Sequence, residues 1–187
     1  MEFTIQYLLS QLFTILSYVS LVFTYQSKKR IHILVLSVLS KVACCIAYIL
    51  LKAYTGFAMC IIALIRDMVF MIDESRNGKR DVITRKDIVF LIILYLITII
   101  SAVFTYQGLY SLLSVMATIL FTYSIWQKKT KVYKLLGIPV GIMLIAYNLC
   151  VKSLFGVTLE SALLIASTVG FIRDGGLWLP KQPKGTD

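Results

Sequence analysis

Apolar runs of nearly twenty residues follow one another along this chain and are separated by short basic clusters. At a helical rise of about 1.5 Å per residue, about 20 apolar residues cross the roughly 30 Å hydrocarbon core of a bilayer. Only helices and closed barrels satisfy all backbone hydrogen bonds in lipid, and long runs without alternation indicate helices. Seven segments are predicted to span the membrane: 3–25, 31–53, 56–73, 87–105, 108–126, 135–155 and 158–173.

The composition agrees with a membrane protein. Of the 187 residues, 59% are hydrophobic and only 15% are charged, and the mean hydropathy is +0.85. A soluble domain of this length needs more charged surface. The net charge of +10 is also typical of nucleic-acid binders, but these carry their basic residues on a soluble face. Here the basic residues lie between apolar runs, so we expect a lipid bilayer and no nucleic acid as partner.

The basic residues lie almost entirely on one side of the predicted bundle. With seven crossings, fifteen lysines and arginines belong to the side that carries the first, third and fifth loops and the C-terminal tail, whereas the opposite side holds only Lys52 and Lys152, at the ends of the second and sixth spans. The positive-inside rule then places the N-terminus outside and the C-terminus in the cytoplasm. One span more or fewer would destroy this asymmetry, so the number of spans and the charge distribution support each other.

Short matches in the same order indicate an internal repeat, with four offsets of 98 to 101 residues and one of 107. We therefore predict an all-α polytopic bundle organised 3+1+3 in one transmembrane domain, residues 1–174, followed by a polar tail, 175–187. The first triplet of helices covers 3–73, the linker helix 87–105, and the second triplet 108–173. A single linker helix keeps the triplets parallel, as in transporters whose solute site lies between the halves near the midplane. The matching segments are Thr4-Ile5-Gln6 with Thr105-Tyr106-Gln107, Phe23-Thr24-Tyr25 with Phe121-Thr122-Tyr123, Ala47-Tyr48 with Ala146-Tyr147, Gly56 with Gly156, and Ile65-Arg66-Asp67 with Ile172-Arg173-Asp174.

The seventh span carries a set of short motifs. Glu160-Ser161 is followed by Leu163-Leu164 and then by Ile172-Arg173, in which the arginine comes thirteen residues after the glutamate. With Ile65-Arg66 closing the third span, the chain resembles the YgjV family of bacterial inner-membrane proteins over about residues 4–174. The resemblance implies a fold and a location in the bacterial cytoplasmic membrane, and it implies no activity. The 3+1+3 plan is also similar, in architecture alone, to the SWEET sugar and PnuC vitamin transporters.

Lys41 is the most informative single residue. It lies ten residues into the second span, about 15 Å deep, which is farther than its side chain reaches toward the interface. The charge must therefore face the bundle interior, and Asp67 at similar depth in the third span is the expected partner. Two interpretations stay open. Lys41 either lines a pathway as an anion-binding or ion-coupling group, or forms a buried pair that only fixes helix register.

Other polar residues within the spans are candidates for the lining of a solute pathway. Glutamine and asparagine are costly to bury in lipid, and several occupy related positions in the two triplets. Glu160 is predicted in the first turn of the seventh span, where it either stabilises the helix N-terminus or contacts a cationic or hydroxyl-rich solute. The candidate substrate-binding residues are Gln6, Gln11, Lys41, Tyr48, Arg66, Asp67, Gln107, Tyr147, Asn148 and Glu160.

No motif in the chain indicates enzyme or metal chemistry. The single histidine, His32, lies beside basic residues, and the four cysteines lie in apolar runs without a CxxC pair. We expect no enzymatic activity, no cofactor and no metal. The sequence favours a small-solute transporter or permease working by alternating access, with a vitamin, nucleoside or sugar-like solute. The alternative is a non-transporting assembly or sensory partner with a packed, dry interior. The sequence does not determine the oligomeric state, and a homo-oligomer is one of the open alternatives.

Overall fold

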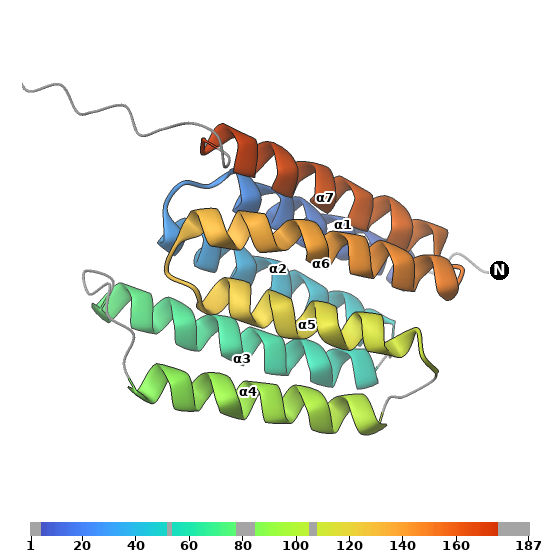
Figure 1. The fold of residues 1–187 in the computed structure, drawn as a ribbon. Helices are drawn as coiled ribbons and strands as arrows, with labels where there is room; N and C mark the ends of the chain where they lie inside the picture. The colour runs from blue at the N-terminus through green and yellow to red at the C-terminus, as the bar shows by residue number, and fades with distance from the viewer. Residues whose placement is uncertain (1–4, 52–53, 78–84, 105–107, 176–187) are drawn as a thin grey trace, which may run out of the picture.

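The chain forms a bundle of helices, seen here in a computed structural model that describes residues 5–51, 54–77, 85–104 and 108–175. All regular structure in these residues is helical, which confirms the predicted all-α bundle of about seven helices. Gln107 and the predicted tail beyond Gly175 lie outside the described residues. The helices are α1 (Ile5–Gln26), α2 (Arg30–Leu50), α3 (Tyr54–Asn77), α4 (Arg85–Phe104), α5 (Ser111–Trp126), α6 (Thr130–Cys150) and α7 (Leu154–Arg173) (Figure 1).

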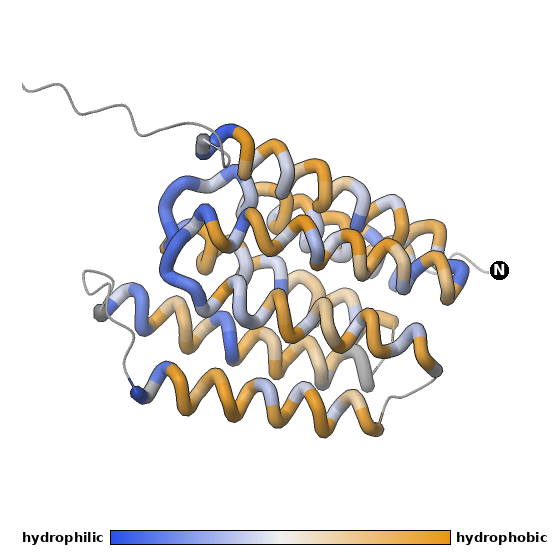
Figure 2. The backbone as a smooth tube through the Cα atoms, viewed as in Figure 1, coloured by the Kyte–Doolittle hydropathy of each residue, from blue (hydrophilic) through white to orange (hydrophobic). Residues whose placement is uncertain are grey.

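Within the described residues, five helices are long and apolar enough to cross a membrane: α1, α2, α4, α6 and α7. Helix α5 is apolar but has only 16 residues. Large apolar side chains such as Ile92 and Ile99 are exposed on the outside of the bundle, as contact with lipid requires. Apolar residues follow the helices, and hydrophilic residues gather around the α1–α2 and α5–α6 loops (Figure 2). The chain is therefore a membrane protein with several spanning helices, and the crossing of α3 and α5 stays a prediction.

The helix ends differ from the prediction in three loops. Helices α3 and α4 both extend into the predicted loop 74–86, and α6 begins at Thr130, inside the predicted loop 127–134. Exposed charged residues such as Arg76 and Lys131 continue these helices because their long side chains reach water from a helix end. Helix α7 begins four residues earlier than expected because Ser153 caps it, its hydroxyl accepting a hydrogen bond from the Gly156 amide at 3.2 Å.

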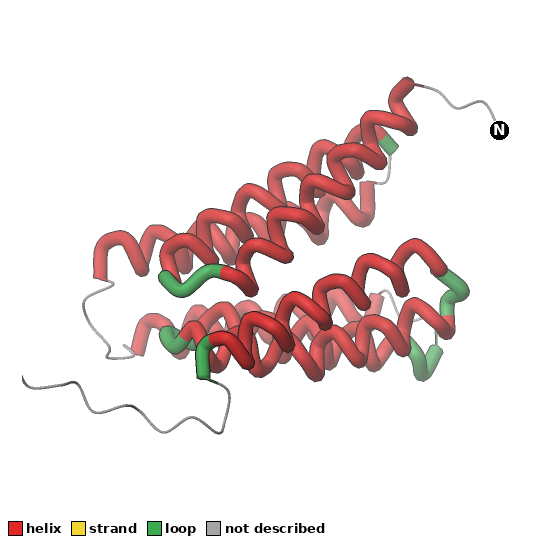
Figure 3. The backbone as a smooth tube through the Cα atoms, turned by 90° about the horizontal axis from the view of Figure 1, so that it is seen from above, coloured by secondary structure: helices red, strands yellow, loops and turns green. Residues whose placement is uncertain are grey.

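The helices form two layers, with α1–α3 in one and α4–α7 in the other (Figure 3). Neighbours in sequence pack together within each layer, and α1 against α7 joins the layers most extensively. The end of the bundle that carries residues 27–30 and 127–131 is called the basic end here. The layers lie closest at this end and diverge toward the other (Figure 3). This order of contacts is compatible with a 3+1+3 plan, and the internal repeat itself stays a prediction.

Small residues let the helices approach one another closely, as is usual between membrane helices. Ser17 of α1 and Ser40 of α2 share a buried hydrogen bond of 2.9 Å between their hydroxyls. Across the two layers, Gly170 of α7 lies so close to α1 that an added Cβ would be 2.1 Å from the carbonyl oxygen of Tyr25. The backbones of α1 and α7 are therefore in direct contact near the basic end.

Candidate functional site

A cavity of about 360 Å³ lies between the two layers, about halfway along the helices. Six helices line it, all except α4. Its volume is in the range of small-molecule sites, which are usually about 300–1,000 Å³. Most of its wall is apolar, and three charged residues, Lys41, Arg66 and Glu160, contribute to the lining. The structure thus has a hollow, charged centre inside a bundle whose outer surface is apolar.

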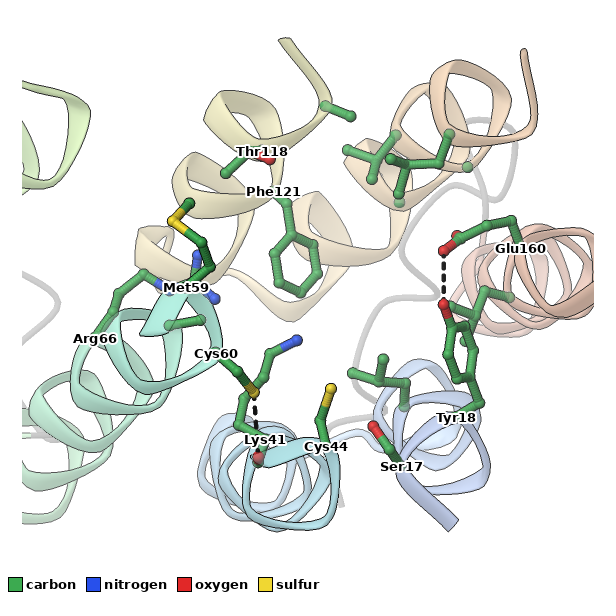
Figure 4. Close-up of a pocket in the computed structure, with 18 of the residues that line it drawn as sticks. Ser17, Tyr18, Lys41, Cys44, Met59, Cys60, Arg66, Thr118, Phe121 and Glu160 are labelled. Atoms are coloured by element: carbon green, nitrogen blue, oxygen red, sulfur yellow. Dashed lines mark hydrogen bonds between the residues drawn. The ribbon is translucent and has the colours of Figure 1, made fainter. Parts of the chain in front are cut away.

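Lys41 projects from α2 into this cavity (Figure 4). Its Nζ lies 5.8 Å from the centre of the Phe121 ring, on α5. Among the described residues, the Lys41 ammonium forms no ion pair within 4 Å. A cation–π contact compensates only part of the cost of removing an ammonium from water. The Lys41 charge is therefore available to an anionic group in the cavity.

Asp67 is fully buried and is held by two other neighbours. Its Oδ1 accepts a hydrogen bond from Arg66 Nε at 2.8 Å, and its Oδ2 accepts one from Ser37 Oγ at 2.6 Å. Arg66 also donates to Thr122 Oγ1 at 3.0 Å. The expected Lys41–Asp67 pair is therefore wrong. The adjacent Arg66 on the same helix and Ser37, one turn along α2 from Lys41, already engage both carboxylate oxygens.

Glu160 reaches the cavity from α7, in the other layer (Figure 4). Its side chain is buried, and its Oε1 accepts a hydrogen bond of 3.2 Å from the Tyr18 hydroxyl. Because α7 begins at Leu154, Glu160 lies in the second helical turn and not in the first as predicted. The stabilising effect of a helix N-terminus falls off within the first turn. Its position at the cavity accounts for Glu160 better than helix capping does.

The remaining candidates from α1 and α2 separate into two groups. Tyr48 lines the cavity together with Lys41. Gln6 is exposed and Gln11 half-buried, and both lie nearer the start of α1 than Ser17, the first α1 residue of the lining. The structure therefore places these two glutamines away from the cavity.

The predicted pair in α6 also lies outside the lining. The Asn148 side-chain amide donates to the Leu144 carbonyl, one turn earlier in the same helix, at 2.8 Å. The Tyr147 ring lies 6.3 Å from the Tyr110 ring, between centres, at the diverging end of the bundle. Both side chains are half-buried and contact neighbours instead of the cavity. Counting along a span gave their depth, but their direction depends on how α6 packs.

Several lining residues were not among the candidates. Tyr18, Cys44, Cys60 and Phe121 all contribute to the cavity. Aromatic residues in spans usually belong to the interface or to packing, and buried cysteines are usually small apolar residues. The only sequence signal for Tyr18 is a hydroxyl near the middle of a span. Its contact with Glu160, 142 positions away, could not be deduced from that signal.

Between the cavity and the basic end, aromatic side chains close the bundle. The Tyr25 ring stacks on Tyr133 with centres 5.0 Å apart and planes 19° apart. The Tyr133 hydroxyl shares a hydrogen bond of 2.8 Å with Thr24, and all three side chains are buried. These contacts join α1 of one layer to α6 of the other.

Further hydrogen bonds join the two layers at the basic end. Arg30 of α2 donates to the Ile125 carbonyl at 3.1 Å. Gln26 of α1 donates to the Ala166 carbonyl at 3.2 Å, and Arg173 donates to the Gln26 carbonyl. The basic end is therefore closed by packing and by polar contacts between the layers.

The chain matches one family along most of its length. The family model for the Imp-YgjV bacterial inner membrane proteins covers residues 8–176. No curated protein and no solved structure gave a match. The match confirms the resemblance drawn from the motifs around Glu160 and Arg66. This chain belongs to the Imp-YgjV family of bacterial inner membrane proteins.

Proposed function

We propose that this protein is a small-solute transporter or permease of the bacterial inner membrane, with the central cavity as its solute site. The observation that carries this proposal is a cavity of about 360 Å³ with Lys41 and Glu160 in its wall, inside a membrane bundle. Charged residues within membrane helices are costly and usually mark the path of a solute or ion. The alternative of a non-transporting partner predicts a packed interior, and the cavity favours transport.

Alternating access between the two layers is the mechanism that we propose. The layers meet at the basic end through the stacked rings of Tyr25 and Tyr133, and they diverge at the other end (Figure 3). Rocking α1–α3 against α5–α7 would separate the two rings and close the diverging end. A central site then faces each side of the membrane in turn, as in other transporters built from two halves.

The direction of access follows from the charge asymmetry. With fifteen basic residues on the cytoplasmic side, the N-terminus is outside and the basic end is cytoplasmic. The closed basic end then corresponds to a state that is closed toward the cytoplasm. This orientation belongs to the proposal.

The test starts from purified protein and a library of vitamins, nucleosides, sugars and amino acids. A solute that binds the folded state at 100 times its Kd adds about 2.7 kcal/mol of stability, which thermal unfolding detects. Each solute that binds is then measured for uptake into proteoliposomes, with protein-free liposomes as the background. We expect uptake by the parent protein and reduced uptake by Lys41→Ala, with exposed Lys28→Ala as the control.

Two outcomes would count against the proposal. Solutes that bind without crossing the membrane would favour a sensory or assembly role. Unchanged uptake by Lys41→Ala, with Lys28→Ala also unchanged, would remove Lys41 from the pathway.

A further inference from the structure

Lys41 and Glu160 place opposite charges on different walls of the cavity (Figure 4). Lys41 comes from α2 and Glu160 from α7, so one charge belongs to each layer. Among the residues that the structure describes, these two form no ion pair within 4 Å. The contact that the Glu160 carboxylate makes is a hydrogen bond of 3.2 Å from Tyr18, which is uncharged. Among the described residues, neither charge therefore has an ionic partner, and a ligand can supply one to each.

The other charges near the cavity neutralise each other. Arg66 and Asp67 are in contact at 2.8 Å, and the remaining oxygen of Asp67 binds Ser37. The cavity therefore presents one free cation and one free anion among its described residues. A purely anionic solute would satisfy Lys41 and leave Glu160 facing a like charge. A purely cationic solute would have the opposite effect, and unpaired charges in a low-dielectric site are costly.

We infer that the solute is a small zwitterion, with its anionic group on Lys41 and its cationic group on Glu160. The inference deepens the proposed function and rests on it for the role of the cavity. The apolar part of the solute would lie against Phe121, whose ring already faces Lys41. A volume of about 360 Å³ holds a molecule of amino-acid size and excludes large peptides. A solute that contacts Lys41 in one layer and Glu160 in the other would also couple its binding to the relative motion of the layers.

The experiment compares charge forms of one scaffold. The probes are leucine, N-acetylleucine, leucinamide and N-acetylleucinamide, which carry both charges, the anion alone, the cation alone and no charge. β-Alanine, γ-aminobutyrate and 6-aminohexanoate vary the distance between the charges. Binding is measured by isothermal titration with the full-length protein in detergent. We expect at least one zwitterion to bind at least ten times more tightly than its single-charge analogues.

Variants then assign each charge. Lys41→Gln should weaken the zwitterion at least tenfold and reduce the advantage of leucine over leucinamide. Glu160→Gln should weaken it similarly and reduce the advantage over N-acetylleucine. Lys28→Gln, an exposed lysine outside the cavity, should bind like the parent protein. If Glu160→Gln does not fold, Tyr18→Phe replaces it, because this variant removes the hydrogen bond to the Glu160 carboxylate. The probe series on the parent protein also tests the preference for a zwitterion without any variant.

The inference is overturned if single-charge probes bind as tightly as zwitterions, if no zwitterion binds, or if both cavity variants keep parental affinity. Uptake into proteoliposomes separates this failure from failure of the proposed function. Zwitterions that bind without being taken up support the assigned ligand and contradict transport. Uptake of a solute with one charge or none, without zwitterion binding, supports transport and contradicts the assigned ligand.

Discussion

Gly170→Ala adds one methyl group where α7 contacts the backbone of α1. The new Cβ would lie 2.1 Å from the Tyr25 carbonyl oxygen and 3.4 Å from Lys134 Cδ. Real Cβ contacts stay beyond about 3 Å, so the two helices must separate by roughly 1 Å at this point. The carbonyl belongs to the backbone of α1 and has no rotamer with which to move aside. The clash therefore acts directly on the seam between the two layers.

The expected cost follows from three contributions. Overpacking a tightly packed site costs about 1–3 kcal/mol. Separating α1 from α7 also weakens the bond of 3.2 Å from Gln26 to the Ala166 carbonyl, which is worth about 1 kcal/mol. Alanine gains about 1 kcal/mol over glycine in a helix. The net destabilisation is about 2 kcal/mol, or a fall of roughly 4–8 °C in Tm for a chain of this size.

The assay is thermal unfolding of the purified protein in detergent, followed by the loss of the monodisperse peak in size-exclusion chromatography. Gly141→Ala is the matched control, because its Cβ would lie no nearer than 3.2 Å to any neighbouring atom, the nearest being Leu164 Cβ, and a shift of a few tenths of an ångström relieves that contact. It has the same gain in helix propensity, and we expect a Tm close to that of the parent. Equal stability of the two variants would refute the argument that backbone contact between α1 and α7 closes the basic end.

Two other predictions concern the basic end and the orientation of the chain. Lys134 is fully buried and its Nζ lies 2.6 Å from Asp174 Oδ2, so Asp174→Asn should cost about 3 kcal/mol by leaving a buried lysine unpaired. The double variant Lys134→Met/Asp174→Asn should recover most of that loss in thermal unfolding, and a double variant as unstable as Asp174→Asn would contradict the pairing. In intact cells, an impermeant maleimide should label a variant whose only cysteine is Cys150, which is exposed at the end of α6. It should not label Lys28→Cys in a cysteine-free background, and the reverse pattern would invert the proposed topology.

The sequence predicts how deep in the membrane the site residues lie, but it does not predict which side chains they contact. Lys41, Tyr48, Arg66 and Glu160 were chosen as polar groups inside spans, and all four line the cavity. Asp67 was chosen on the same grounds, but it pairs with Arg66 and lies outside the lining. Position along a span can be counted at a fixed rise per residue. The direction of a side chain around the helix axis depends on which neighbours the helix contacts.

Lys134 illustrates the same limit at a helix end. A basic residue beside a span is expected in a cytoplasmic loop, and Lys134 was counted there. The structure instead places it inside α6, fully buried against Asp174. Lys134 pairs with Asp174 in the space between α6 and the end of α7. Two separate helices must meet before that space exists.

The sequence alone determined that this chain is a multi-pass helical membrane protein, and it indicated the family. Those conclusions are local, because the length of an apolar run and the hydrogen-bonding needs of a backbone in lipid decide them segment by segment. Tertiary structure alone decided that a cavity exists, that Lys41 and Glu160 face it without pairing, and that the basic end is closed. In lipid, helices associate through close packing of small residues and scattered polar contacts. Such contacts form between residues far apart in the chain, so no single span contains the information that selects them.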